Sequence, residues 1–144
     1  MRIRMLLDKK GREVVTAPPS LSVPDAARLM NKHNIGSVVV VHGGVVQGIV
    51  TERDIRRVVG GACSSMEKMT VKEAMTSDVI VGVPEDSLDY VMEIMTRNRI
   101  RHLPVMAAGG LEGILSVGDV IDALRKNVEA ENRYMLDYIQ GKVF

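Results

Sequence analysis

The sequence predicts a mixed α/β (α+β) fold in which two β-α-β-β-α units pack on each other around a pseudo-two-fold axis. Three observations predict it: the chain repeats itself at a fixed offset, each copy alternates β-rich runs with helical periodicity, and the composition is that of a globular protein. With 144 residues, 46% of them hydrophobic and 26% charged, the chain can bury about two-thirds of its unfolded surface. We therefore expect it to fold without disulfides or metals.

The internal repeat appears when the sequence is shifted by 65 residues. From Glu13 to Gly60 the two copies align without a gap, and conservative pairs such as Val50 and Leu115 lie between the identical ones. The identical pairs are Val14/Val79, Pro19/Pro84, Ser22/Ser87, Met30/Met95, Ile35/Ile100, Val40/Val105, Gly44/Gly109, Gly48/Gly113, Ile49/Ile114 and Asp54/Asp119. The Gly- and Ser-containing stretch at 60–69 predicts a linker. The repeat predicts a first copy with its N-terminal segment at 1–62, a second copy at 63–126 and a C-terminal helical tail at 127–144.

Each copy is expected to begin with a short strand, at 14–16 and at 79–81, and to continue after a proline into a helix. The second copy shows this helix clearly, because its apolar residues recur at helical spacing and Asp86 precedes them as a candidate N-cap. The apolar stripe consists of Leu88, Val91, Met92 and Met95.

Two more β-rich runs follow in each copy, at 37–41 and 45–50 and again at 103–106 and 111–115, around glycine-containing turns that permit positive φ. A second helix is expected to open at Thr51 and at Ser116. Three strands with helices on one side leave an apolar sheet face uncovered, so the two copies are expected to cover each other.

The composition excludes several partners. The chain has three Tyr, one Phe and no Trp, and Tyr134, Tyr138 and Phe144 all lie near its end. Single-stranded nucleic acid is commonly bound by stacking on aromatic side chains, and duplexes by a large positive charge, whereas the net charge here is +1. We therefore expect no nucleic-acid partner.

The sequence also predicts a soluble cytoplasmic protein. Cys63 is the single cysteine and cannot pair within the chain, and we interpret it as an unreactive loop residue. Charges interrupt the N-terminal apolar run, and no segment has the roughly 18 apolar residues of a membrane span. No spacing of His, Cys, Asp and Glu predicts a metal site, and no nucleophile with a base is evident.

The sharpest local motif is the junction between strand and helix, Gly48-Ile-Val-Thr51-Glu-Arg53-Asp54, which returns as Gly113-Ile-Leu-Ser116-Val-Gly118-Asp119. A hydroxyl residue followed three positions later by an acid is typical of a helix capping box. The same groups also suit a nucleotide, because helix amides and a hydroxyl can bind phosphate while a carboxylate accepts ribose hydroxyls. Seen twice at one offset, the motif keeps both interpretations open.

These junctions, together with the strand Arg99-Ile-Arg-His-Leu-Pro-Val105, resemble the CBS domain, the module named after cystathionine β-synthase. The resemblance covers roughly residues 10–126 and is closest to small stand-alone CBS-pair proteins of bacteria and archaea to which signal-transduction roles are assigned. It implies a tandem pair that binds an adenosyl ligand between its copies. The ligand would be AMP, ADP, ATP, NAD(H) or S-adenosylmethionine, and no metal would be required. The resemblance also implies a homodimer.

The resemblance assigns residues to this ligand. It places Asp54 and Asp119 on ribose hydroxyls and Thr51 and Ser116 near phosphate. It places Thr16, Ala17 and Val81 around the adenine, and further cleft residues at the strand starts, namely Ile35, Gly36 and Ser37 in the first copy and Ile100, Arg101, His102, Leu103 and Pro104 in the second.

The two sites are expected to be unequal. The second copy offers the basic pair Arg101 and His102, which with Ser116 would form the stronger phosphate site, whereas the first copy offers Gly36 and Ser37 at the matching positions. Arg53 of the first junction would compensate in part.

Three functions follow from these expectations. The preferred one is a regulatory module that signals nucleotide binding through rearrangement of a dimer to an unknown effector protein. The alternatives are an interaction scaffold with unoccupied pockets and, with less support, a nucleotide-processing enzyme. At 127–144, apolar and aromatic residues at helical spacing predict an amphipathic helix that forms a dimer contact.

Overall fold

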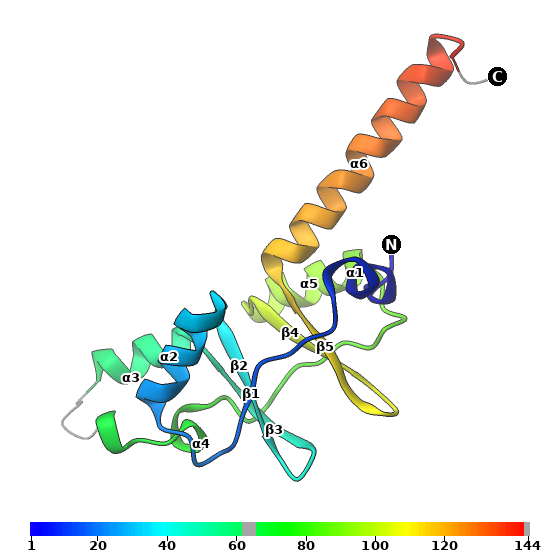
Figure 1. The fold of residues 1–144 in the computed structure, drawn as a ribbon. Coiled ribbons are helices and arrows are strands. Elements are labelled where there is room, and N and C mark those ends of the chain that lie inside the picture. Colours follow the sequence, from blue (N-terminus) through cyan, green and yellow to red (C-terminus); the bar gives the residue numbers. More distant parts are fainter. Residues whose placement is uncertain (62–65, 143–144) are drawn as a thin grey trace.

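The computed structural model describes residues 1–61 and 66–142, and it confirms the mixed α/β class and the two copies (Figure 1). The predicted boundary between residues 62 and 63 and the cysteine at position 63 lie outside the described residues. The elements are α1 (Ile3–Lys10), β1 (Thr16–Ala17), α2 (Val23–His33), β2 (Ser37–His42), β3 (Val45–Thr51), α3 (Glu52–Gly60), the 3-10 turn Met66–Lys68, α4 (Val71–Ala74), α5 (Leu88–Asn98), β4 (His102–Ala107), β5 (Gly110–Ser116) and α6 (Val117–Ile139).

The two sheets differ in one strand. In the first copy the order is β1-β2-β3, with β1 parallel and β3 antiparallel to β2, whereas the second copy has only the antiparallel pair β4-β5. The predicted strand at 79–81 is therefore wrong, and its place is taken by a single parallel bridge between Gly82 and Val105. Ile80 packs partly against the core, but Val81 and Val83 are exposed and Gly82 between them has no side chain, so little burial supports a longer ladder here.

The sequence repeat corresponds to helix caps, helix ends and β-bulges that recur in the two copies. Ser22 and Ser87 are the N-caps of α2 and α5, and Asn34 and Arg99 end these helices in the left-handed region with φ of 51° and 54°. All are 65 positions apart, like the bulges that follow Val40 and Val105 in the two hairpins. The two copies are therefore built by the same local rules.

The predicted cap at Asp86 is wrong by one residue. Ser87 Oγ accepts the Tyr90 N–H at 3.1 Å, while Asp86 Oδ2 accepts the Val83 N–H at 2.9 Å and so closes the turn before the helix. Both side chains bond to backbone amides three residues away, but the serine lies at the helix start and the aspartate outside it.

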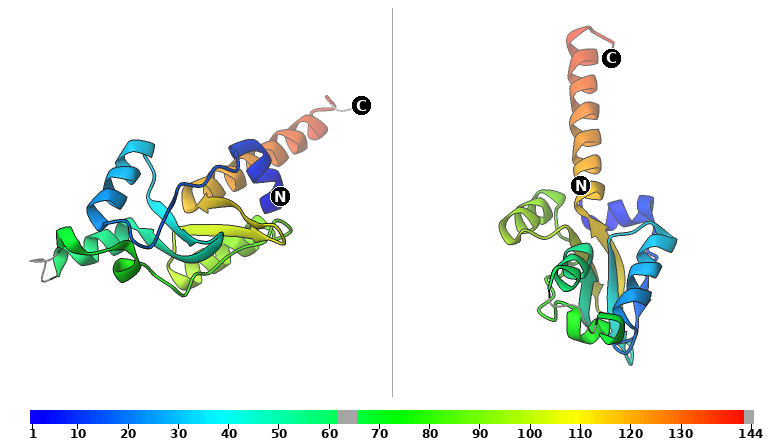
Figure 2. Two further views of the ribbon diagram at one scale, coloured as in Figure 1. Left: turned by 60° about the horizontal axis from the view of Figure 1, so that its bottom comes forward. Right: turned by 90° about the vertical axis from the view of Figure 1, so that its left-hand side faces the viewer.

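The N-terminal segment packs on the second copy, although it precedes the first. Ile3, Leu6 and Leu7 of α1 are buried in one cluster with residues of α5, β4, β5 and α6. A second cluster, which includes Val38, Val50 and Val71, forms the core of the first copy and takes in α4. Each copy is thus covered by the segment that precedes the other, and Figure 2 shows α1 beside the start of α6.

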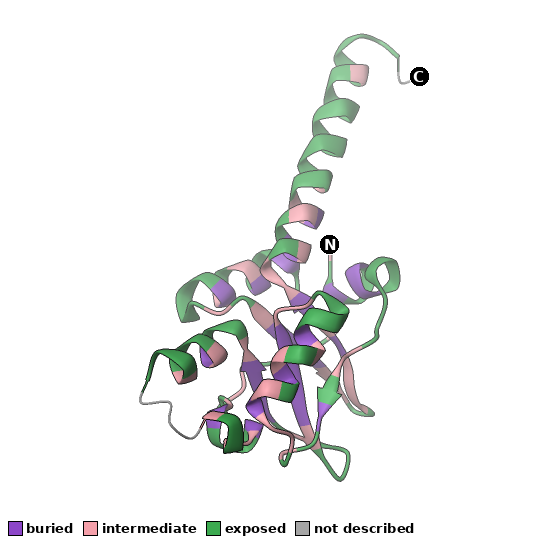
Figure 3. Cartoon of the chain, turned by 60° about the vertical axis from the view of Figure 1, so that its left-hand side comes forward, coloured by how far each residue is buried: buried purple, intermediate pink, exposed green. Residues whose placement is uncertain are grey.

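The predicted tail helix is the continuation of α6, which runs unbroken from Val117 to Ile139. Val120 and Ala123, both in its first two turns, are its buried residues among those described, and the later turns extend away from the body (Figure 3). No helix in the described part of the chain is long and apolar enough to span a membrane.

Candidate functional site

Both strand-to-helix junctions form capping boxes, which confirms one of the two interpretations of the motif. In the first copy the Thr51 N–H donates to Asp54 Oδ2 at 2.9 Å and the Asp54 N–H donates to Thr51 Oγ1 at 3.4 Å. In the second copy the corresponding distances between Ser116 and Asp119 are 2.8 and 3.1 Å. Each box fixes a carboxylate on the first turn of its helix.

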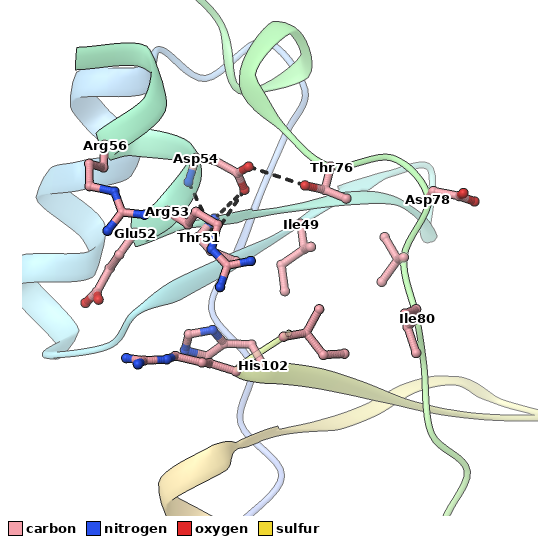
Figure 4. Close-up of a pocket in the computed structure, with 13 residues that line it drawn as sticks. Ile49, Thr51, Glu52, Arg53, Asp54, Arg56, Thr76, Asp78, Ile80 and His102 are labelled. Atoms are coloured by element: carbon pink, nitrogen blue, oxygen red, sulfur yellow. Dashed lines mark hydrogen bonds between the residues drawn. The ribbon is translucent and has the colours of Figure 1, made fainter. Parts of the chain in front are cut away.

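A cavity of about 530 Å³ lies beside the first junction, and we call it the interdomain cavity because both copies line it (Figure 4). The first copy contributes the end of β3 and the start of α3, and the second copy contributes the start of β4 and the segment before α5. The lining residues are Ile49, Thr51, Glu52, Arg53, Asp54, Arg56, Thr76, Asp78, Val79, Ile80, Ile100, Arg101 and His102.

Three arginines of the interdomain cavity are available for an anion. Within the described ranges, Arg53, Arg56 and Arg101 form no ion pair, and all three are exposed. Arg57, one turn away, differs because its guanidinium lies 3.2 Å from Asp54 Oδ1. Unpaired guanidinium groups gathered in one cavity are suited to phosphate, which they bind through paired N–H donors.

Asp54 is the buried acidic group of this cavity, with 6% of the residue exposed. Its Oδ2 accepts from Thr51 N–H and, at 3.2 Å, from Thr51 Oγ1, while its Oδ1 accepts from Arg57 at 3.2 Å and from Thr76 Oγ1 at 3.3 Å. A carboxylate has about four acceptor positions, so all are in use. The bond from the Thr51 amide has the usual length, and the three side-chain contacts, at 3.2–3.3 Å, are longer.

His102 stands on the wall opposite Asp54 and is contacted from the first copy at Gly36. Burial lowers the pKa of His102, and the charges of Lys10 and Arg101 act in the same direction, while Glu52 and Asp119 oppose them. The imidazole is therefore held toward its neutral form, beside arginines that carry the positive charge of the cavity.

The second junction has different surroundings. Lys10 Nζ lies 2.6 Å from Asp119 Oδ2, and Asp119 lines a separate cavity between α1 and α6 together with Lys9, Lys10 and Lys126. Partial burial of the Asp119 carboxyl acts to raise its pKa, but hydrogen bonds from Lys10 and Ser116 outweigh this, so the pKa lies below its usual value.

The structure therefore groups the predicted site residues differently from the expectation. Arg101 and His102 line the interdomain cavity with Thr51, Arg53, Asp54 and Ile100, rather than sharing a cavity with Asp119. Ser116 faces His102 in the β4–β5 ladder and caps α6.

The remaining predicted residues lie outside the lining. Thr16 and Val81 are exposed; Ala17 and Ser37 are buried; Leu103 and Pro104 are buried in β4; Ile35 packs against the core of the first copy. Gly36 abuts His102 from the first copy.

Sequence reasoning placed Val81 of the segment before α5 at the ligand but missed the neighbours that line the cavity. Thr76, Asp78, Val79 and Ile80 lie there, and the backbone of Thr76 pairs with Ile49 in both directions at 2.9 Å. The repeat offered a signal, since Val81 aligns with Thr16 of the predicted adenine segment of the first copy. Glu52 and Arg56 were missed as well, although both are on the helix that begins at Thr51. Among the described residues, no group of three His, Cys, Asp or Glu side chains is arranged to hold a metal.

Comparison with known proteins identifies the family and the fold. The family model for the CBS domain matches residues 10–61 and 71–126, which are the two copies. The chain is 38% identical over 125 residues to the mitochondrial CBS domain-containing protein CBSX3 of Arabidopsis thaliana, covering 83% of this chain and 61% of that protein, so it spans less than two-thirds of that relative.

Solved structures show the same fold. A CBS-domain containing protein from Agrobacterium tumefaciens is 44% identical with a TM-score of 0.83, and the match covers 85% of this chain and 98% of the other. The CBS domain pair of protein MJ0100, solved in complex with 5′-methylthioadenosine and S-adenosylmethionine, is 26% identical with a TM-score of 0.78, covering 88% and 98% of the two chains. With both copies matched and the fold shared, the chain belongs to the CBS domain family and is a tandem CBS domain pair.

Proposed function

We propose that the chain is a regulatory module that binds an adenosyl nucleotide in the interdomain cavity and signals its occupancy through the relative positions of the two copies. The observation that carries this proposal is the cavity itself, in which one buried carboxylate, Asp54, lies with three arginines that form no ion pair in the described part of the chain. A ribose with an attached phosphate carries the complementary groups, two hydroxyl donors and an anion.

The ribose would bind at Asp54. Its hydroxyls would replace the long contacts that Thr76 Oγ1 and Arg57 make to Oδ1, at 3.3 and 3.2 Å, while the amide of Thr51 keeps Oδ2 in place. The capping box then has a second use, because it holds the carboxylate in one orientation before the ligand arrives.

The phosphate would bind among Arg53, Arg56 and Arg101. AMP, ADP, ATP and NAD(H) all bring this anion, whereas S-adenosylmethionine brings a sulfonium and fits the arginines less well. The complex of the MJ0100 pair supports an adenosyl ligand as the class.

The purine would lie against aliphatic side chains. Ile49, Val79, Ile80 and Ile100 are the apolar residues of the lining, which contains no Phe, Tyr or Trp. Contacts of this kind contribute through burial and without aromatic stacking, so we expect modest affinity that follows nucleotide concentration.

Signalling would follow because both copies contribute residues to the interdomain cavity. Asp54 and Arg53 belong to the first copy and Arg101 and His102 to the second, so a ligand that contacts both favours the arrangement in which they are close. A tenfold preference for one arrangement corresponds to about 1.4 kcal/mol. An effector protein, of unknown identity, would bind the favoured arrangement.

The outer part of α6 is our candidate for a homodimer contact. Its large apolar side chains are more than half exposed, and Val128, Met135 and Tyr138, which are seven and three residues apart, share one face of the helix. The exposed apolar residues of this part of the helix are Val128, Tyr134, Met135, Leu136, Tyr138 and Ile139. A reducing cytoplasm, with neither nucleic acid nor membrane as a partner, remains our prediction for the setting.

A thermal-shift panel with AMP, ADP, ATP, NAD, NADH and S-adenosylmethionine tests this function. A ligand at one hundred times its Kd adds about 2.7 kcal/mol to the free energy of unfolding, and Asp54→Asn should remove this gain. No shift with any of the six would favour the scaffold, and steady turnover of ATP or NAD by the purified protein would favour the enzyme.

A further inference from the structure

The helices α1 and α4 are equivalent in the two copies, but α1 is one turn longer. Gly113 is covered by Leu7 of α1, and its repeat partner Gly48 is covered by Met75, directly after α4. A Cβ on either glycine would lie within 2.8 Å of the covering side chain, so each helix is docked closely on its sheet. After these matched contacts the paths diverge, because α4 ends at Ala74 while α1 continues to Lys10.

The extra turn brings Lys10 to the second junction. At the first junction, Thr76 makes two bonds: its N–H donates to the Ile49 carbonyl at 2.9 Å and its Oγ1 to Asp54 Oδ1 at 3.3 Å. At the second junction Lys10 Nζ contacts the Ile114 carbonyl at 2.6 Å and Asp119 Oδ2 at 2.6 Å, and this Oδ2 also accepts the Ser116 N–H. One ammonium thus contacts the same two groups as an amide and a hydroxyl do at the first junction, but it bonds to the other carboxylate oxygen.

This exchange changes what a ligand must displace. At Asp54 a ribose hydroxyl competes with a long bond from a neutral hydroxyl and with a guanidinium at 3.2 Å. At Asp119 it meets a carboxylate whose charge is already paired with an ammonium through a short bond to Oδ2, and both side chains of this pair are about 70% covered. Charge-assisted bonds of this length are among the strongest in proteins.

The packing of α1 on the second copy also holds the Lys10 ammonium in place. Ile3 and Leu7 of α1 are fully or almost fully buried in the core of the second copy, and the Ile3 N–H donates to the Asp86 carbonyl at 2.9 Å. Moving Lys10 away from Asp119 therefore requires a change in its own side chain or the last turn of α1, while the rest of the helix stays docked.

We propose that Lys10 is the specificity-determining residue that selects between the two junctions: it occupies Asp119 from within the chain, so one adenosyl ligand binds per chain, at Asp54. This rests on the proposed function. Substitution of Lys10 by an uncharged side chain of similar length would make Asp119 available and create a second binding event.

Isothermal titration with AMP tests this directly. We expect one AMP per chain for the wild type, two for Lys10→Met, and one for Lys9→Met, the matched control from the same helix. Two AMP per chain in the wild type, or one per chain in both the wild type and Lys10→Met, would overturn the assignment. Binding by Lys10→Met alone would overturn the proposed Asp54 site and keep the role of Lys10, whereas no binding by either protein would overturn both.

A ligand-free readout separates the ion pair from the nucleotide. In a double-mutant cycle of Lys10→Met and Asp119→Asn, measured by urea unfolding, the effects should be non-additive, because either single change already removes the pair. Additive effects would show that the two side chains are not coupled and would overturn the mechanism, whatever the titration gave.

Discussion

His102 of the second copy lies over the backbone of Gly36 of the first: a Cβ built on Gly36 would lie 3.0 Å from His102 Nε2. Glu52 Oε1 would lie 3.2 Å from the same point, so the His102 imidazole and the Glu52 carboxylate both lie next to the space that a side chain at Gly36 would occupy. In the repeat, Gly36 aligns with Arg101 and Ser37 with His102, so this contact has no counterpart on the other side of the pair. The glycine provides the space that a histidine from the other copy occupies.

Gly36→Ala should therefore weaken nucleotide binding with little effect on folding. The backbone at Gly36 has no positive φ, so alanine adds no strain there, but its methyl must push the imidazole by a few tenths of an ångström. We expect the Kd for AMP to rise several-fold in a titration, while Tm without ligand changes little. Gly60→Ala, where a Cβ meets nothing within 4 Å, is the matched control. Equal Kd values for Gly36→Ala and wild type would argue against His102 as part of the site.

The stability of the protein should depend on pH through His102. Because burial lowers its pKa in the folded state, the unfolded chain takes up a proton first as the pH falls. The stabilising contribution of the neutral imidazole is complete above the unfolded pKa of about 6.5 and is lost as the pH falls through the folded pKa. Urea unfolding at pH 7.5 and at lower pH should show a steeper loss for wild type than for His102→Gln, and parallel curves would contradict this.

Docking of α1 should contribute substantially to stability. Leu7 is 1% exposed and fills the space above Gly113, so Leu7→Ala should lower the free energy of unfolding by about 2–5 kcal/mol. Met5, on the opposite face of the same helix, is 51% exposed, and Met5→Ala should change the free energy of unfolding by less than about 0.5 kcal/mol. Chemical denaturation of both variants measures the difference, and a comparable loss in the two would mean that α1 is not docked as described.

Truncation after Lys126 tests the role proposed for the outer part of α6. The removed segment has no buried residue among those described, so the truncated chain should fold with a similar Tm. Light scattering should show a dimer for the full chain and a monomer for the truncated one. If the full and the truncated protein have the same number of chains per particle, the helix is not the dimer contact.

Much of the fold could be predicted because its devices are local and occur twice. The capping boxes at Thr51 and Ser116 and the turn at Gly43 and Gly44 each depend on a few neighbouring residues, and the predicted cap of α5 was only one residue from the observed cap at Ser87. Their recurrence after 65 residues also predicted that two copies would form one molecule.

The misses depend on contacts between distant segments. Ile3, Leu6 and Leu7 have helical spacing, but the charges between them hid a helix that is stable because the second copy covers it. The ion pair between Lys10 and Asp119 joins residues far apart in the sequence, so no spacing rule could predict it. For the same reason the sequence grouped Arg101 and His102 with the second junction, whereas in the structure they line the interdomain cavity together with Asp54.

The most direct measurement is a crystal structure of the chain with AMP bound. It should show the ribose hydroxyls at Asp54 and the phosphate among Arg53, Arg56 and Arg101, with Lys10 still on Asp119. An AMP with its ribose on Asp119, or density only in the cavity between α1 and α6, would contradict the account.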